Sequence, residues 1–135
     1  MKVLIITLIV IGLFLVTGCT ASDTPSGPGP VTDAKDIVGT WQNFGRYTQF
    51  NEDGTYRFGS SIEGLVERPW VKGEYWFEKG QFFKKEIEVH NVPACGNAIG
   101  IYEVKMLENG NLVFTIVEDE CEPRATKSEE YKRVG

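Results

Sequence analysis

Three glycine-containing turns constrain the fold of this chain more than any other feature. They occur at residues 50–56, 77–82 and 107–112, and in each a polar residue and a glycine lie between apolar positions. Glycine after a polar residue supplies the positive φ angle that tight β-hairpins require. Three such hairpins, joined in sequence order, predict at least six antiparallel strands.

The sequence from residue 39 onward predicts eight short strands. Apolar and polar residues alternate in several of them, and none of this region shows sustained helical periodicity. Residues 33–38 are expected to form a short helical turn that plugs one end, and residues 60–69 an irregular loop. Eight strands with one apolar face favour an all-β, up-and-down antiparallel barrel, because closure removes exposed strand edges. The predicted strands are 39–44, 46–51, 55–60, 70–78, 82–91, 99–107, 111–117 and 128–134.

The alternation assigns one face of each strand to the barrel interior. Glu86, Glu88 and His90 are expected to point outward from their strand, and Trp70 and Trp76 from theirs. The interior positions are Tyr56 and Phe58; Val71, Gly73, Tyr75 and Phe77; Phe83, Ile87 and Val89; and Tyr102, Val104 and Met106.

The first 18 residues have the features of a signal peptide. Lys2 supplies a positive charge, and the apolar run at 3–16 is too short to span a hydrocarbon core comfortably. Residues 16–19, Val-Thr-Gly-Cys, resemble the lipobox of bacterial lipoproteins. That resemblance implies a mature protein that begins at Cys19 and carries acyl chains, which gives stable anchoring. An uncleaved anchor, or an ordinary signal peptide followed by a chance cysteine, is the alternative.

Residues 19–35 are expected to form a flexible tether, with the folded domain at 36–135. The stretch from residue 20 to 30 is rich in Pro, Gly, Ser and Thr and cannot bury enough apolar surface to offset its ordering entropy. Thr20, rather than Asp, follows the cysteine, which favours the outer membrane if the host has one. The protein is therefore expected in the cell envelope, outside the cytoplasm.

The charge balance excludes one class of partner. The chain has 14 Lys and Arg against 19 Asp and Glu, a net charge of -5. Nucleic-acid binding needs clustered cations that replace the counterions of the phosphates. We therefore expect no nucleic-acid partner.

Gly39-Thr40-Trp41 matches the G-x-W signature of the lipocalin superfamily. With the turn at 50–56, it makes the chain similar to small bacterial lipocalin-like domains, although the Thr-Asp-Tyr motif and C-terminal helix of full lipocalins are absent. The resemblance implies a lipocalin-like barrel in which Trp41 lies across the closed end. It also implies an arginine packed on that Trp, with Arg133 the nearest match by position and Arg124 the second.

The interior aromatic residues are the candidate ligand site. Tyr56, Phe58, Tyr75, Phe77 and Tyr102 share the predicted interior face. They could line a cavity for an apolar or amphipathic small molecule, with the tyrosine hydroxyls as polar contacts, or they could fill the core. An eight-stranded barrel has room for either.

Cys95 and Cys121 are expected to form a disulfide, as an even pair in an exported domain. The domain has a single histidine and no C-x-x-C pair, so no metal site, cofactor or catalytic residue is predicted. His90 is expected on the surface, because no nucleophile or orienting partner accompanies it. The acidic run 118–122 lacks a calcium-loop pattern and is expected to be a solvated loop, with Arg124 pairing locally.

Two functions follow from these patterns. The first is a membrane-anchored, non-enzymatic binding protein that holds a small apolar or amphipathic ligand. The alternative is a solid barrel that binds an envelope protein as an inhibitor, assembly factor or sensor. Trp70 and Trp76 would then form the docking surface, unless they only cover a loop.

Overall fold

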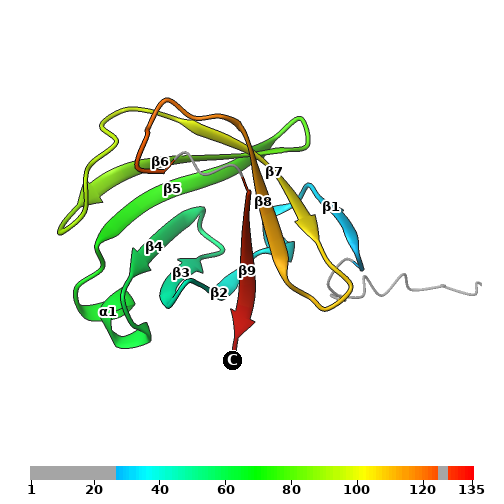
Figure 1. Cartoon of the computed structure of the whole chain (residues 1–135), viewed down its shortest axis with the longest axis horizontal. Coiled ribbons are helices and arrows are strands. Elements are labelled where there is room, and N and C mark those ends of the chain that lie inside the picture. The colour runs from blue at the N-terminus through cyan, green and yellow to red at the C-terminus, as the bar shows by residue number, and fades with distance from the viewer. Residues whose placement is uncertain (1–26, 125–127) are drawn as a thin grey trace, which may run out of the picture.

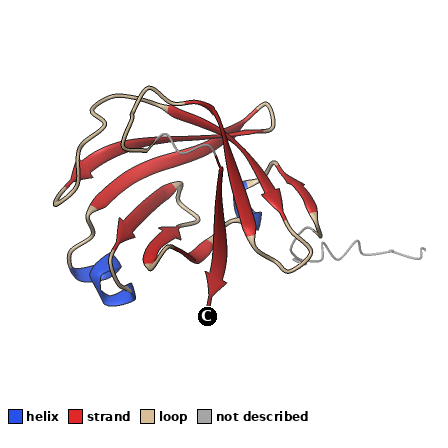
Figure 2. Cartoon of the chain, in the orientation of Figure 1, coloured by secondary structure: helices blue, strands red, loops and turns tan. Residues whose placement is uncertain are grey.

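The computed structural model describes residues 27–124 and 128–135 of the chain. Its regular structure is almost entirely β-strand, with helix confined to two short segments (Figure 2). The predicted signal peptide, 1–18, and Cys19 lie outside the described residues. The elements in chain order are β1 (Gly29–Val31), η1 (Ala34–Asp36), β2 (Gly39–Asn43), β3 (Arg46–Phe50), β4 (Thr55–Gly59), α1 (Ile62–Glu67), β5 (Val71–Glu78), β6 (Gln81–Val89), β7 (Gly100–Met106), β8 (Leu112–Glu118) and β9 (Ser128–Val134).

Strands β2 to β9 form a closed antiparallel barrel (Figure 1). Each of them pairs with the next strand in sequence, and β9 pairs back with β2 to close the ring. Trp41 lies opposite Thr48 on one neighbouring strand and Arg133 on the other. The predicted all-β, up-and-down barrel is confirmed, and the strand boundaries differ from the predicted ones by at most two residues.

The three predicted glycine turns are present and use the expected backbone geometry. Gly54, Gly80 and Gly110 have φ angles of 81°, 77° and 81°. Each lies between two paired strands: β3 and β4, β5 and β6, and β7 and β8. A side chain would be strained at these angles, which explains why glycine occupies all three positions.

Part of the segment predicted to be a flexible tether forms the strand β1. Gly29–Val31 pairs with β7, opposite Val104–Met106, along the edge that β6 leaves uncovered. Val31 is buried in the core. The domain boundary predicted at residue 36 is therefore too late. Proline, which cannot donate to a strand ladder, made this segment look like linker, yet Pro30 is tolerated in a short edge strand.

The closed end of the barrel is built around Trp41. Its side chain is fully buried, and its indole Nε1 donates to the Ile37 carbonyl at 2.7 Å, just after η1. The Arg133 guanidinium lies 4.3 Å from the Trp41 ring centroid and donates to the Val38 carbonyl at 3.1 Å. A Cβ at Gly39 would lie only 2.7 Å from Arg133 Nη1, so glycine makes room for this stack. The expected contact between Trp41 and Arg133 is present.

Over most of its length, β6 turns toward the barrel interior the face that was predicted to point outward. Phe82 is fully buried, whereas Phe83 stacks on Trp76 outside the barrel and Ile87 is 62% exposed. The register shifts by one residue at Ile87, since Glu86 pairs with Gly73 and Glu88 with Lys72. This β-bulge reverses the alternation, so only Val89 of the three predicted interior positions packs on the core.

The predicted irregular loop at 60–69 contains the helix α1. Ser61 caps it by accepting a hydrogen bond from the Gly64 amide at 2.9 Å. Leu65 alone is buried, and it packs toward β3 and β4. One buried residue in a six-residue helix gives no periodic signal, so the helix could not be recognised from the pattern.

Aromatic rings fill the middle of the barrel. Phe82 lies at the centre of this cluster, with Phe50, Tyr75 and Phe114 at ring-centroid distances of 5.7, 5.8 and 5.1 Å.

None of the described helices is long and apolar enough to cross a membrane.

Candidate binding cavity

A cavity of about 310 Å³ opens at the barrel mouth, at the end away from Trp41. Its floor and walls include Phe50, Phe58, Val71 and Phe114. Residues from the β2–β3 hairpin, the loop after β6 and the loop after β8 form the rim. The volume lies at the lower end of the range for small-molecule pockets. The barrel is thus filled at one end and hollow at the other.

The five predicted ligand-binding residues divide between these two regions. Tyr56, Phe58 and Tyr102 line the cavity. Tyr75 and Phe77 do not, because they belong to the filled core: the Tyr75 hydroxyl donates to the Asn51 carbonyl at 2.6 Å, and Phe77 packs on Phe82. Burial raises the pKa of Tyr75 to about 12.

A buried ion pair stands behind one wall of the cavity. Arg124 Nε and Nη2 donate to the two carboxylate oxygens of Asp119 at 2.6 and 2.9 Å, and Nη2 also donates to the Ala98 carbonyl at 2.9 Å. The Arg124 side chain is 8% exposed and that of Asp119 is 0% exposed. The expected local pairing of Arg124 is present, but the expectation of a solvated loop is wrong for Asp119.

The Asp119 carboxylate accepts hydrogen bonds from three residues. Besides Arg124, the Tyr102 hydroxyl and the Cys121 amide donate to its carboxylate. Burial acts to raise the pKa of Asp119, but the hydrogen bonds from Arg124, Tyr102 and Cys121 outweigh it and the pKa is lowered. Gly100 permits this close approach, because a Cβ there would overlap both Asp119 and Tyr102.

Lys84 is the unexpected feature of the cavity. It extends inward from β6, and its Nζ lies 5.0 Å from the Tyr102 ring centroid in a cation–π contact. Among the described residues, no carboxylate lies within 4.0 Å of this ammonium. Burial, and next the charge of Arg124, lower the pKa of Lys84 to about 8.

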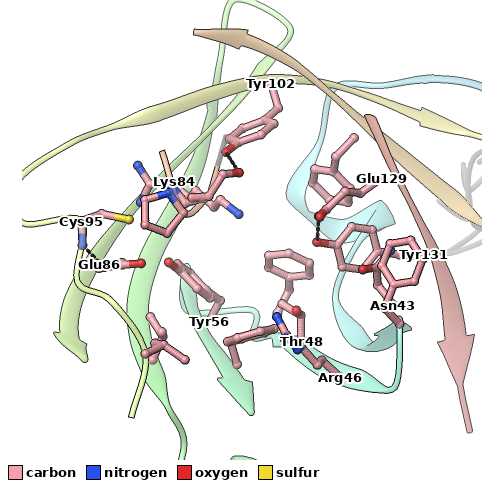
Figure 3. Close-up of a pocket in the computed structure, with 18 of the residues that line it drawn as sticks. Asn43, Arg46, Thr48, Tyr56, Lys84, Glu86, Cys95, Tyr102, Glu129 and Tyr131 are labelled. Carbon is pink, nitrogen blue, oxygen red and sulfur yellow. Dashed lines mark hydrogen bonds between the residues drawn. The ribbon is translucent and has the colours of Figure 1, made fainter. Parts of the chain in front are cut away.

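Two loops at the mouth are tied together. Cys95, after β6, and Cys121, after β8, form the predicted disulfide, with their Cα atoms 5.2 Å apart. The Cys95 amide also donates to Glu86 Oε2 at 2.8 Å, inside the cavity (Figure 3). The disulfide holds the Asp119–Arg124 segment against the rest of the rim. It is also consistent with an extracytoplasmic location.

The two predicted docking residues do not form one exposed surface. Trp70 packs against the core and makes an edge contact with Phe58 at 5.8 Å between ring centroids. Trp76 does lie outside the barrel, but it stacks on Phe83 at 5.5 Å and is only partly exposed. Trp70 turns inward because it precedes β5 and does not follow the alternation of that strand.

Sequence reasoning did not identify Lys84, Glu86 and Arg124, which line the cavity, or Asp119, which pairs with Arg124, as site residues. Lys84 and Glu86 alternate with Phe82, so the correct choice between Phe82 and Phe83 as the inward residue would have revealed them. Phe82 and Phe83 are adjacent and equally apolar, and the pattern cannot separate them. For Asp119 and Arg124, the nearby Cys121 was the available signal, since a disulfide brings its flanking residues to a defined place.

Other candidate chemistries have no cluster to support them. The exposed His90 imidazole pairs with the Glu88 carboxylate at 2.7 Å. In the described part of the chain, no three His, Cys, Asp or Glu side chains come together as metal ligands.

No protein-family model, curated protein or solved structure matches this chain. The function therefore has to be inferred from the cavity and its chemistry.

Proposed function

We propose that this protein is a lipid-anchored, lipocalin-like binding protein that holds a small amphipathic molecule in the mouth of its barrel. The observation that carries the proposal is the open cavity of about 310 Å³ beside a fully packed core. A barrel of this size fills its interior with side chains unless space is kept for a ligand. Aromatic walls and a few polar groups are the usual composition of such sites.

The anchor follows from the lipobox resemblance at residues 16–19, and it would place the barrel at a membrane surface outside the cytoplasm. A short tether before β1 would keep the domain close to the source of amphipathic molecules. The proposed role is binding without catalysis, with no resident cofactor.

Native mass spectrometry of the full-length protein from its host tests the proposal. We expect a bound small molecule in the wild type. Val92→Trp, at the half-buried rim of the cavity, should expel it by filling the mouth. Val117→Trp is the matched control, because Val117 is 50% exposed on β8 and does not line the cavity. No bound molecule in the wild type, or equal retention by both variants, would contradict ligand binding in this cavity.

A further inference from the structure

Three hydrogen-bond donors in the cavity wall have no acceptor among the described residues. They are Lys84 Nζ, the Tyr56 hydroxyl and Arg124 Nη1. Arg124 Nη1 is buried without a partner, and neither Lys84 Nζ nor the Tyr56 hydroxyl donates to any described residue. Buried donors are nearly always paired in folded proteins, so the unpaired Arg124 Nη1, with two further donors of the cavity wall near it, indicates a missing acceptor.

These donors lie in one region of the cavity. The Lys84 ammonium lies over the Tyr102 ring, and the Tyr102 hydroxyl shares the Asp119 carboxylate with Arg124. In Figure 3 the Tyr56 ring extends into the cavity with its hydroxyl toward the side where Lys84 and Glu86 lie. Lys84 and Tyr56 both line the cavity, and Arg124, paired with Asp119, lies in the wall behind them.

The acids of the cavity are already engaged. Glu86 accepts from the Cys95 amide at 2.8 Å, and Glu129 accepts from the Tyr131 hydroxyl at 2.6 Å (Figure 3). Asp119 is held by Arg124 and Tyr102. Each acid thus has its own donor, whereas the ammonium of Lys84 has no carboxylate within 4.0 Å among the described residues and is influenced by Glu129, Asp119 and Glu86 only through longer-range charge interactions.

An ammonium inside the barrel without a carboxylate close to it destabilises the fold. Such local conflicts are characteristic of binding sites, where a ligand supplies the missing group. A carboxylate is the best complement, because its two oxygens accept several hydrogen bonds and its charge offsets that of Lys84. The lining also includes Phe50, Phe58 and Phe114, which form an aromatic wall for an apolar tail.

We propose that the cavity is specific for a small carboxylate with an apolar tail, held by Lys84 and Tyr56 with Arg124 behind them and with its tail against the aromatic wall. This inference rests on the proposed binding function and adds the chemical class of the ligand. It requires the ligand to be an anion, which the proposed function alone does not.

Binding of labelled octanoate to the full-length protein in lipid nanodiscs tests the inference, with uptake by empty nanodiscs subtracted. Octanol and octyltrimethylammonium have the same tail with a neutral or a cationic head. At pH 7 we expect octanoate to bind at least about tenfold more tightly than octanol, as a hydrogen bond to a charged group implies. The cation should not bind measurably.

Lys84→Met should weaken octanoate binding at least about tenfold and leave octanol binding unchanged. Lys85→Met is the matched control, because Lys85 is the next residue and pairs with Glu74 at 3.1 Å, away from the cavity lining. Tyr56→Phe keeps the ring and should weaken octanoate binding by about threefold to tenfold. Arg124 is left intact, since its pairing with Asp119 supports the fold.

Equal affinity for octanoate and octanol, or equal losses in Lys84→Met and Lys85→Met, would overturn the inference and leave the proposed binding function standing. Failure of all three probes to bind above the empty nanodiscs would overturn both.

Discussion

At the scale of single residues, Trp41 is the largest side chain in the barrel that is completely buried. It fills the closed end. Its indole nitrogen donates a hydrogen bond to the Ile37 carbonyl, and its ring face packs against the Arg133 guanidinium. Trp41 therefore combines packing with two directional contacts, which neighbouring side chains could not replace by relaxing into the space.

Trp41→Ala should lower the free energy of unfolding by about 3–5 kcal/mol, the range for removing a buried Trp. Urea titration of the variant and the wild type measures this. Trp76→Ala, which removes a tryptophan from the outer surface, should cost clearly less. A loss below about 1 kcal/mol for Trp41→Ala would show that the residue does not seal the barrel.

Unlike Trp41, the charged Lys84 side chain lowers the stability of the folded protein. Its pKa in the folded protein, about 8, lies below the ordinary lysine value of 10.5, so the fold binds its proton less tightly than the unfolded chain does. Below pH 8 both states carry the charge, and the cost of burying it is present in full. Between about pH 8 and 10.5 the folded protein loses the proton first, and the contribution of Lys84 to stability rises with pH.

Lys84→Met should therefore raise the free energy of unfolding by about 1–3 kcal/mol at pH 7, with the gain shrinking as the pH rises toward 10. Urea titrations at pH 7 and pH 10 give the two values. Lys85→Met should show neither the gain nor the trend. If Lys84→Met destabilised the protein at pH 7, the ammonium would have a stabilising partner inside the cavity.

At the scale of the elements, β1 extends the domain beyond the eight strands of the barrel. It covers the part of β7 that β6 does not reach, and Val31 closes the core there with 1% of its surface exposed. Its neighbour Pro30 is exposed in the same strand. The segment before the barrel thus combines a linker-like composition with one side chain that belongs to the core.

Val31→Ala should cost about 1.5–2 kcal/mol, because it removes two buried carbon atoms at about 0.8 kcal/mol each. Pro30→Ala, in the same strand but exposed, should change stability by less than about 0.5 kcal/mol. Thermal or urea unfolding of the two variants makes the comparison. Equal, negligible effects would mean that β1 contributes nothing to the fold in solution.

Strand β6 supplies the polar wall of the site. Lys84 and Glu86 face the interior because they alternate with the buried Phe82, and the bulge at Ile87 then turns Val89, rather than Glu88, toward the core. Gly73, opposite Glu86, is required by the same packing, since a Cβ there would overlap the Tyr56 ring and the Lys85 carbonyl. The polar wall of the cavity therefore depends on the inward position of Phe82 and on one glycine.

At the scale of the whole molecule, the chain divides into a closed, filled end and an open, partly polar end. The closed end supplies stability through Trp41 and the aromatic cluster. The open end has loops held by a disulfide, and it carries an ammonium that has no acceptor among the described residues, which does not serve stability. This division is the general arrangement expected of a small barrel that binds a ligand at its mouth.

The anchoring of the molecule can be tested separately from binding. If residues 16–19 act as a lipobox, labelled palmitate should be incorporated into the wild type and lost in Cys19→Ser, because the thiol is the acceptor of the lipid. Thr20→Ala, at the adjacent position, should keep the label. Labelling of Cys19→Ser, or no labelling of the wild type, would leave residues 1–18 as another kind of leader or anchor.

Local signals in the sequence determined the architecture. Turn glycines such as Gly54 and period-two alternation depend only on neighbours in the chain, and they predicted eight strands in the right places. The cysteine pair likewise indicated the disulfide. The packing of Arg133 on Trp41 was implied by the resemblance of Gly39-Thr40-Trp41 to the lipocalin signature, and no local pattern indicated it.

Only the tertiary structure decided which residues form the site. The inward position of Lys84 follows from that of Phe82, which packs on aromatic rings of other strands, and the burial of Asp119 depends on Arg124 and Tyr102, which reach it from a loop and from β7. A strand that gains one residue against its partner exchanges its two faces, and nothing in its own sequence records where this happens. The barrel could therefore be predicted from local sequence patterns, whereas its polar cavity arises from contacts between distant segments.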